Sequence, residues 1–171
     1  MIRVVEGDLA LLAADALVRP ATTRLDPTAA ALRRVESAGG PEFHNRLRLS
    51  RELPVGAAVV TAAGGALPTE FVIHAVIRSE TEPVTRGSVA RAWLSALQQA
   101  QEWEFAHVSA PPIGTGAGNL PLEEAAEIMV TVLSAHMGSA KMPSEVSLVV
   151  ETREDREVFE AALRRDAEPL S

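Results

Sequence analysis

Alternation between two kinds of segment is the feature that most restricts the fold of this chain. From residue 71 onward, short apolar runs rich in β-branched residues are separated by longer segments whose apolar residues recur every three or four positions. The short runs are expected to be strands, at 71–77, 105–110 and 145–151. The longer segments are expected to be helices, starting at Ser88, at Pro121 and after a capping Thr152. This alternation predicts a largely parallel sheet covered by helices.

The first half of the chain carries the same kinds of element in a less regular order. Strands are expected at 2–7, 15–20 and 56–62. Asp26 is interpreted as the cap of a helix with Pro27 at its first position, ending at Gly39 and Gly40. Pro41 then opens a second helix. No linker or repeat interrupts the sequence, so residues 1–165 are expected to form a single domain, followed by a flexible tail at 166–171.

Composition excludes several classes of site. The 171 residues suit one domain with a sizeable core, and they include no cysteine, which rules out disulfides, thiolate catalysis and zinc–cysteine sites. No histidines stand at metal-ligand spacing, so we expect no metal. The net charge of −7 argues against a surface for duplex DNA. With no targeting signal and no apolar stretch of about 20 residues, we expect a cytoplasmic protein that contacts no membrane.

A glycine-rich segment stands between the strand expected at 105–110 and the helix that begins at Pro121. Its sequence, PPIGTGAGNLP, places glycine at 114, 116 and 118. Glycine permits positive φ angles, and bare amides beyond the carboxyl end of a parallel strand can bind a phosphate. A turn that binds nothing is the alternative. The segment lacks the Lys-Ser/Thr pair of a Walker loop and the spacing of the dinucleotide fingerprint.

Four segments together resemble the macro domain family of ADP-ribose-binding modules. VVEGDLALLAADALV resembles the family's Gly-Asp and Asp-Ala-Ile-Val opening, and GGPEF resembles its Ala-Gly-Pro-Glu-Leu. LPVGAAVVTAAGGALPTEFVIHAV resembles its Cys-Pro-x-Gly-Glu-Ala stretch and Tyr-Val-Ile-His strand, and PPIGTGAGNLPLEEAA resembles its second phosphate loop. The four occur in the family's order and spacing over residues 2–163. The resemblance implies a three-layer α/β/α sandwich around a mixed, roughly six-stranded sheet.

The resemblance also implies where a ligand would lie. In the family, the aspartate of the Gly-Asp pair accepts a hydrogen bond from the adenine amino group, and the matching residue is Asp8, which also suits a helix N-cap. The second loop wraps the diphosphate through backbone amides, and Thr115 adds a hydroxyl there. No cofactor is implied. The expected ligand-binding residues are Asp8, Leu9, Ala21, Thr22, Thr23, Ile113, Gly114, Thr115, Gly116, Ala117 and Gly118.

The first ligand loop departs from the family pattern. The family usually has Asn-Ala-Ala-Asn after its second strand, and then a run of glycines. The two asparagines correspond to Arg19 and Thr22, and the glycine run corresponds to residues 27–30, PTAA. Proline donates no amide hydrogen, and alanine resists positive φ angles. The family's helical aspartate and histidine correspond to Leu32 and Glu36.

Single side chains near this loop leave alternatives open. Thr22 or Thr23 could replace one asparagine hydrogen bond. Arg24 could offer a charged fork to a phosphate, although a surface arginine beside Asp26 is the simpler interpretation. His74 lies in an apolar strand and is interpreted as a hydrogen-bonded core histidine.

Three functions follow as hypotheses. The first is binding of ADP-ribose, of a related adenine nucleotide, or of an ADP-ribosyl group on a protein. The second is an ADP-ribosyl hydrolase or deacylase that works with a rebuilt first loop. The third is a scaffold that has lost the ligand and acts through protein contacts. Because the asparagines and glycines are replaced, binding is favoured over catalysis, and no catalytic residue is assigned.

Overall fold

The chain forms six strands, four α-helices and one short 3₁₀ helix in the part that the structure, a computed structural model, describes. That part comprises residues 1–28, 32–47, 52–116 and 119–168. The elements follow in the order β1 (Ile2–Glu6), η1 (Leu9–Leu11), β2 (Ala16–Thr22), α1 (Leu32–Arg46), β3 (Ala58–Ala62), β4 (Phe71–Arg78), α2 (Arg86–Glu102), β5 (His107–Ala110), α3 (Leu122–Ser139), β6 (Glu145–Val150) and α4 (Arg153–Ala167).

All six strands belong to one mixed sheet in the order β1-β6-β5-β2-β4-β3. Every neighbouring pair is parallel except β3 and β4, which are antiparallel. The largely parallel sheet expected from the alternating segments is therefore confirmed. Parallel strands bring their carboxyl ends to a common edge of the sheet, where the loops that follow them gather.

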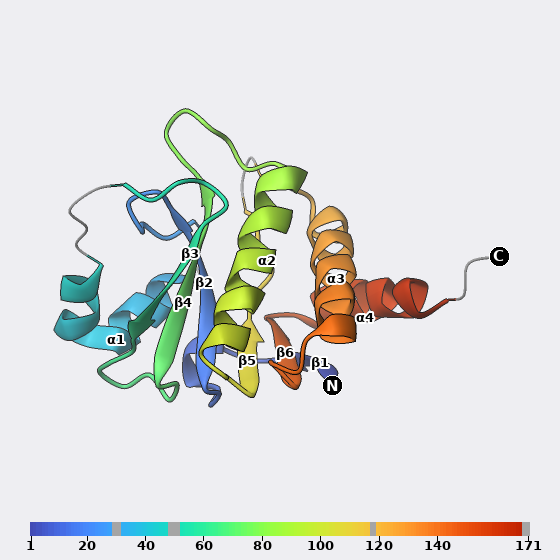
Figure 1. The fold of residues 1–171 in the computed structure, drawn as a ribbon, viewed down its shortest axis with the longest axis horizontal. Coiled ribbons are helices and arrows are strands. Elements are labelled where there is room, and N and C mark those ends of the chain that lie inside the picture. Colours follow the sequence, from blue (N-terminus) through green and yellow to red (C-terminus); the bar gives the residue numbers. More distant parts are fainter. Residues whose placement is uncertain (29–31, 48–51, 117–118, 169–171) are drawn as a thin grey trace.

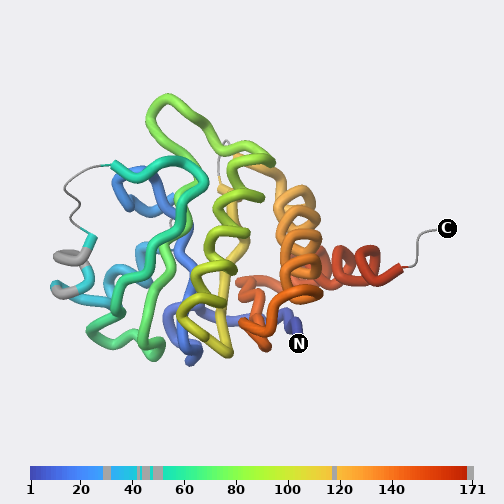
Figure 2. The backbone as a smooth tube through the Cα atoms, in the orientation of Figure 1, coloured from blue at the N-terminus to red at the C-terminus, as the bar shows by residue number. Residues whose placement is uncertain are grey.

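The sheet is covered on both faces. Figures 1 and 2 show α2 and α3 side by side over one face, and the core on that face also includes Phe159 and Ala162 of α4. On the opposite face, Leu32, Val35 and Phe43 of α1 pack with η1 residues and with apolar side chains of the strands. The molecule is the three-layer α/β/α sandwich that the resemblance implied.

Helix α2 shows how local sequence signals position an element. Its N-cap is Thr85, whose hydroxyl accepts from the Ser88 amide while the Ser88 hydroxyl accepts from the Thr85 amide. The helix thus begins at Arg86, two residues before the start expected from the sequence. Its apolar stripe faces the sheet, and Trp93 is fully buried and donates its indole N–H to the Met129 carbonyl of α3.

Two expectations for the first half of the chain are wrong. Strand β2 continues through Pro20 to Thr22, because a proline is tolerated where one neighbour is missing and β2 pairs with β5 only at Ala16 and Leu17. Pro27 is not the first residue of a helix, since it forms an isolated antiparallel bridge with Ala21. The expected break at Gly40 is present as a non-helical kink within α1.

The C-terminal helix extends into the segment expected to be a tail. Helix α4 begins after Thr152, whose hydroxyl accepts from the Asp155 amide as the capping pattern predicted. It ends at Ala167, so two residues of the expected tail are helical. None of the described helices is long and apolar enough to cross a membrane.

Candidate functional site

A cleft of about 360 Å³ lies where the segments after β1, β5 and β6 meet. Gly7 follows β1, Pro111 follows β5 and Glu151 follows β6, and all three residues line it. This is the edge at which open α/β sheets bind ligands. Much of the wall is apolar, and it includes Leu9, Leu32, Leu120, Leu122 and Val149.

One end of the cleft carries Asp8. Its Oδ1 accepts a hydrogen bond from the Ala10 amide at 2.9 Å, so Asp8 is the N-cap of η1. Its Oδ2 lies 3.4 Å from Nε of Arg34, a residue of α1 that also forms an ion pair with Glu151. The hydrogen bond to Glu151 is the main reason that the pKa of Arg34 is raised. This end of the cleft therefore presents a partly exposed carboxylate, held in place by a backbone amide and an arginine.

The glycine loop, described at residues 111–116 and 119–121, also lines the cleft. Gly114 and Gly116 adopt φ angles of 87° and 117°, which L-residues with side chains rarely adopt. The carbonyl oxygens of residues 114, 115 and 116 all accept bonds within the loop, from the amide of Leu120, the side chain of Asn119 and the amide of Asn119. Within the described residues, no protein acceptor is paired with the amides of 114, 115 or 116. The loop thus bonds these three carbonyls internally and leaves the three amides without a described protein partner.

Two residues of this loop set its position and do not line the cleft. Ile113 is fully buried, and its amide contacts the Met129 sulfur at 3.2 Å. A Cβ atom on Gly114 would lie 2.4 Å from a methyl group of Val89, so α2 packs directly against the loop there. Thr115 and Gly116, which line the cleft, are held forward by these contacts.

The first loop, residues 22–28, differs from the glycine loop in that its amides are bonded within the protein. The amides of Thr22, Thr23 and Leu25 donate to the carbonyls of Asp26, Arg78 and Thr22. The amides of residues 24 and 26 both donate to the hydroxyl of Thr22, at 3.3 and 3.1 Å. Residue 27 is a proline and has no amide hydrogen. Every amide from 22 to 26 is thus bonded within the protein.

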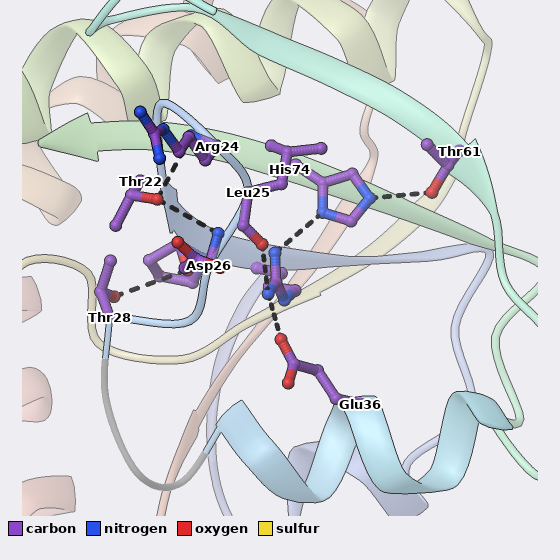
Figure 3. A network of polar contacts seen from close by, with 10 residues as sticks. Thr22, Arg24, Leu25, Asp26, Thr28, Glu36, Thr61 and His74 are labelled. Atoms are coloured by element: carbon purple, nitrogen blue, oxygen red, sulfur yellow. Dashed lines mark hydrogen bonds and ion pairs between the residues drawn. The ribbon is translucent and has the colours of Figure 1, made fainter. Parts of the chain in front are cut away.

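A buried polar network holds this loop from below (Figure 3). Arg19 of β2 is fully buried and pairs with Glu36 of α1. The same guanidinium donates to the Leu25 carbonyl at 2.7 Å, and its other terminal nitrogen lies 3.3 Å from Nδ1 of His74. Burial lowers the pKa of Arg19, while the hydrogen bond and the charge of Glu36 act in the opposite direction.

His74 completes the network as a neutral side chain. Arginine can only donate, so Nδ1 of His74 accepts and its Nε2 carries the hydrogen, which is donated to the Thr61 hydroxyl at 2.8 Å. Burial, and then the positive charge of Arg19, lower the pKa of His74 to about 3. The expectation of a hydrogen-bonded core histidine is confirmed.

The sequence-predicted site residues fall into three groups in the structure. Asp8, Leu9, Thr115 and Gly116 line one cleft. Ala21 is buried, while Thr22 and Thr23 border a separate hollow with Arg24 and Asp26. Ile113 and Gly114 lie behind the cleft, and Ala117 and Gly118 lie outside the described residues.

Three ion pairs were not predicted from the sequence: Arg19–Glu36, Arg34–Asp8 and Arg34–Glu151. Arg19 and Glu36 were each noted as departures from the family, and the opposite charges at those two positions were the signal that they pair. Arg34 was not singled out, because it meets Asp8 and Glu151 only through the fold. Arg24 is a surface arginine, 62% exposed, but its partner is Glu52 at 2.8 Å.

The described residues contain no group of three or more histidines, aspartates and glutamates placed to hold a metal ion. The cleft is lined by three carboxylates, Asp8, Glu151 and Asp155, together with Arg34, two threonines, the glycine loop and apolar side chains. Carboxylates and unpaired amides in one cleft suit a ligand that carries both a hydrogen-bond donor and an anionic group.

Comparison with known proteins agrees with this geometry. The profile of the macro domain family matches residues 18–129. A macro domain-containing protein of Caldanaerobacter subterraneus is 31% identical over 94% of both chains. The O-acetyl-ADP-ribose deacetylase of Escherichia fergusonii is 29% identical over 98% of this chain and 97% of its own.

Solved structures show the same fold. The Oceanobacillus iheyensis macrodomain with ADP superposes with a TM-score of 0.84 at 24% identity, covering 95% of this chain and 89% of that one. The Trypanosoma brucei macrodomain in complex with ADP-ribose gives a TM-score of 0.83 at 18% identity, covering 95% of this chain and 68% of that one. The family profile and the relative that is 31% identical over 94% of both chains show that this chain belongs to the macro domain family.

Proposed function

We propose that this protein binds ADP-ribose or a related adenine nucleotide in the cleft between Asp8 and the glycine loop. The observation that carries the proposal is the orientation of the loop: its carbonyls at 114–116 accept bonds internally, while its amides have no described protein partner. Thr115 and Gly116 line the same cleft as Asp8. Unpaired amides beyond a parallel strand form an anion site without any charged side chain, so the net charge of −7 is no obstacle.

Asp8 and the apolar wall of the cleft suit an adenine base. Oδ1 of Asp8 is engaged by the Ala10 amide, and Oδ2 faces Arg34 at 3.4 Å, but each carboxylate oxygen can accept more than one hydrogen bond. The exocyclic amine of adenine is such a donor. Leucine and valine side chains that line the cleft offer the base and the sugar an apolar wall, and a cleft of about 360 Å³ falls within the usual size of ligand sites.

Hydrolysis of an ADP-ribosyl linkage is the second candidate, favoured by the similarity to an O-acetyl-ADP-ribose deacetylase. It would need a group in the first loop that holds water or the distal ribose. Instead, the hydroxyl of Thr22 accepts hydrogen bonds from the amides of residues 24 and 26, and Arg19 is paired with Glu36. Binding without hydrolysis is therefore the function that these contacts support better.

Calorimetric titration of the full chain with ADP and GDP tests the proposal, together with the variant Asp8→Asn. Asparagine keeps an acceptor for the Ala10 amide but removes the charge and places an NH₂ group opposite the base. We expect ADP to bind better than GDP, and Asp8→Asn to weaken ADP by about tenfold and to abolish that preference.

The matched control is Asp166→Asn, an exposed aspartate on α4, which should leave both affinities unchanged. Absence of binding by ADP-ribose, ADP and AMP would refute the proposal and favour a scaffold that acts through protein contacts. Equal weakening of ADP and GDP by Asp8→Asn would instead place the base elsewhere in the cleft.

A further inference from the structure

The first loop has no backbone donors left for a ligand between residues 22 and 26. Each of these five amides is bonded inside the protein, and two of them share the hydroxyl of Thr22. To engage a ligand, these amides would have to break their bonds and leave the acceptors unpaired. That cost opposes rearrangement of the loop. The amides of residues 22–26 are therefore poorly placed to bind an anionic group, which is the role proposed for the amides of the glycine loop.

The contacts of Arg19 oppose a change in the conformation of this loop. Leu25 adopts a φ angle of 64°, an uncommon value for a leucine, and its carbonyl accepts from the buried guanidinium at 2.7 Å. The same guanidinium pairs with Glu36 and contacts His74, so the carbonyl is one of the few partners of a buried charge. Removing a partner from a buried charge carries a large penalty, so Arg19 holds the loop where it is.

The part of the first loop nearest the glycine loop offers a carbonyl. A methyl group built on Gly116 would lie 3.7 Å from the carbonyl oxygen of Thr28, and Thr28 lines the cleft beside Gly116. The Thr28 hydroxyl is directed at the Pro20 carbonyl, 3.5 Å away. This oxygen is an acceptor, so it offers no hydrogen to a group bound beyond the diphosphate.

We propose that the Arg19–Glu36 pair holds the first loop in a self-bonded conformation, so that the cleft recognises the adenosine diphosphate portion of its ligand and does not read a terminal ribose. Arg19 and Glu36 are then specificity-determining residues that act by positioning the loop and do not touch the ligand. The inference rests on the proposed function, since it concerns the same cleft. It predicts that ADP and ADP-ribose are equivalent ligands, and that the ADP-ribosyl attachment is irrelevant to affinity.

Calorimetric titrations with ADP, ADP-ribose and AMP test the specificity. We expect the dissociation constants for ADP and ADP-ribose to agree within about threefold, and AMP, which lacks one phosphate, to bind at least about tenfold more weakly. ADP-ribose binding more than tenfold tighter than ADP would overturn the inference and leave the proposed function standing. Failure of all three to bind would overturn both.

Hydrogen exchange followed by mass spectrometry tests the mechanism. In the free protein, peptides covering residues 22–26 should exchange slowly, and neither ADP nor ADP-ribose should change their rate. The peptide covering 111–121 should gain protection equally with both ligands. Protection of 22–26 that appears with ADP-ribose and not with ADP would show that the first loop reads the ribose, and would overturn the inference.

The variant Arg19→Met/Glu36→Met tests the role of the ion pair without leaving an unpaired buried charge, an exchange that folded proteins often tolerate. We expect exchange in residues 22–26 to accelerate at least about tenfold, because the Leu25 carbonyl loses its donor. Arg24→Met/Glu52→Met removes an exposed pair next to the same loop and should leave the rate unchanged. Equal rates in wild type and the Arg19 variant would show that another contact holds the loop, and would overturn the proposal.

Discussion

The loops that follow β2 and β5 stand at the same edge of the sheet, yet they differ in whether their backbone amides are bonded within the protein. The first loop directs the amides of residues 22–26 into the protein. The glycine loop directs the carbonyls of residues 114–116 into the protein and leaves their amides without a described partner. Whether the amides already have partners, more than the residue types, decides which loop can hold an anion.

The comparison also shows that arginines near a loop do not by themselves make an anion-binding site. The first loop and its support contain Arg19 and Arg24, but Arg19 is paired with Glu36 and Arg24 with Glu52. The described part of the glycine loop contains no charged side chain. Positive charge near a loop is therefore a poor guide to a phosphate site when the charge is already neutralised by a carboxylate.

The largest effect is expected from breaking the support of the first loop. Arg19→Met removes the only charged partner shown for Glu36 and one donor to Leu25, and should lower the free energy of unfolding by about 3–5 kcal/mol. Arg24→Met is the matched control, since its ion pair is exposed, and should change stability little. Urea denaturation of both variants measures this difference. Equal losses of stability in the two variants would mean that the buried ion pair contributes no more than the exposed one.

A second change is directed at the glycine loop. Gly116→Glu puts a side chain on a residue at φ 117° and a negative charge beside the unpaired amides, so ADP should bind about 100-fold more weakly, equivalent to about 3 kcal/mol. Gly138→Glu on α3 is the control, because a Cβ atom there meets no other atom within 4 Å. Calorimetry with ADP measures both. Unchanged affinity in Gly116→Glu would mean that the phosphates bind elsewhere.

The smallest effect concerns pH and the histidine under the first loop. The pKa of His74 is lowered to about 3, against about 6.5 in an unfolded chain, so the folded state resists its protonation. This contribution to stability is complete above the unfolded value and is lost as pH falls toward the folded one. Between pH 7 and pH 5, the wild type should lose about 2 kcal/mol more than His74→Gln, measured by urea denaturation. Parallel losses in the two proteins would show that His74 is protonated without cost.

Much of the fold could be predicted because its signals are local. Alternating strand and helix patterns indicated the parallel sheet, and hydroxyl caps such as Thr152 marked a helix start. The position of the first helix could not be predicted in the same way. Asp26 and Pro27 are residue types that commonly begin a helix, but the bridge between Pro27 and Ala21 holds the chain extended at that point. A tertiary contact there overrides a local preference.

For the site, the sequence by itself determined that Asp8 follows the first strand, that glycines stand at alternate positions after the β5 strand, and that the first loop lacks its usual glycines. These are properties of residue order and of backbone freedom. Only the tertiary structure decided that Arg19 reaches Glu36, that Arg34 reaches Asp8, and that the amides of residues 22–26 are bonded while those of 114–116 have no described partner. Those contacts join residues on different elements, and the distance between such residues is set by the packing of the whole sandwich, which no local pattern encodes.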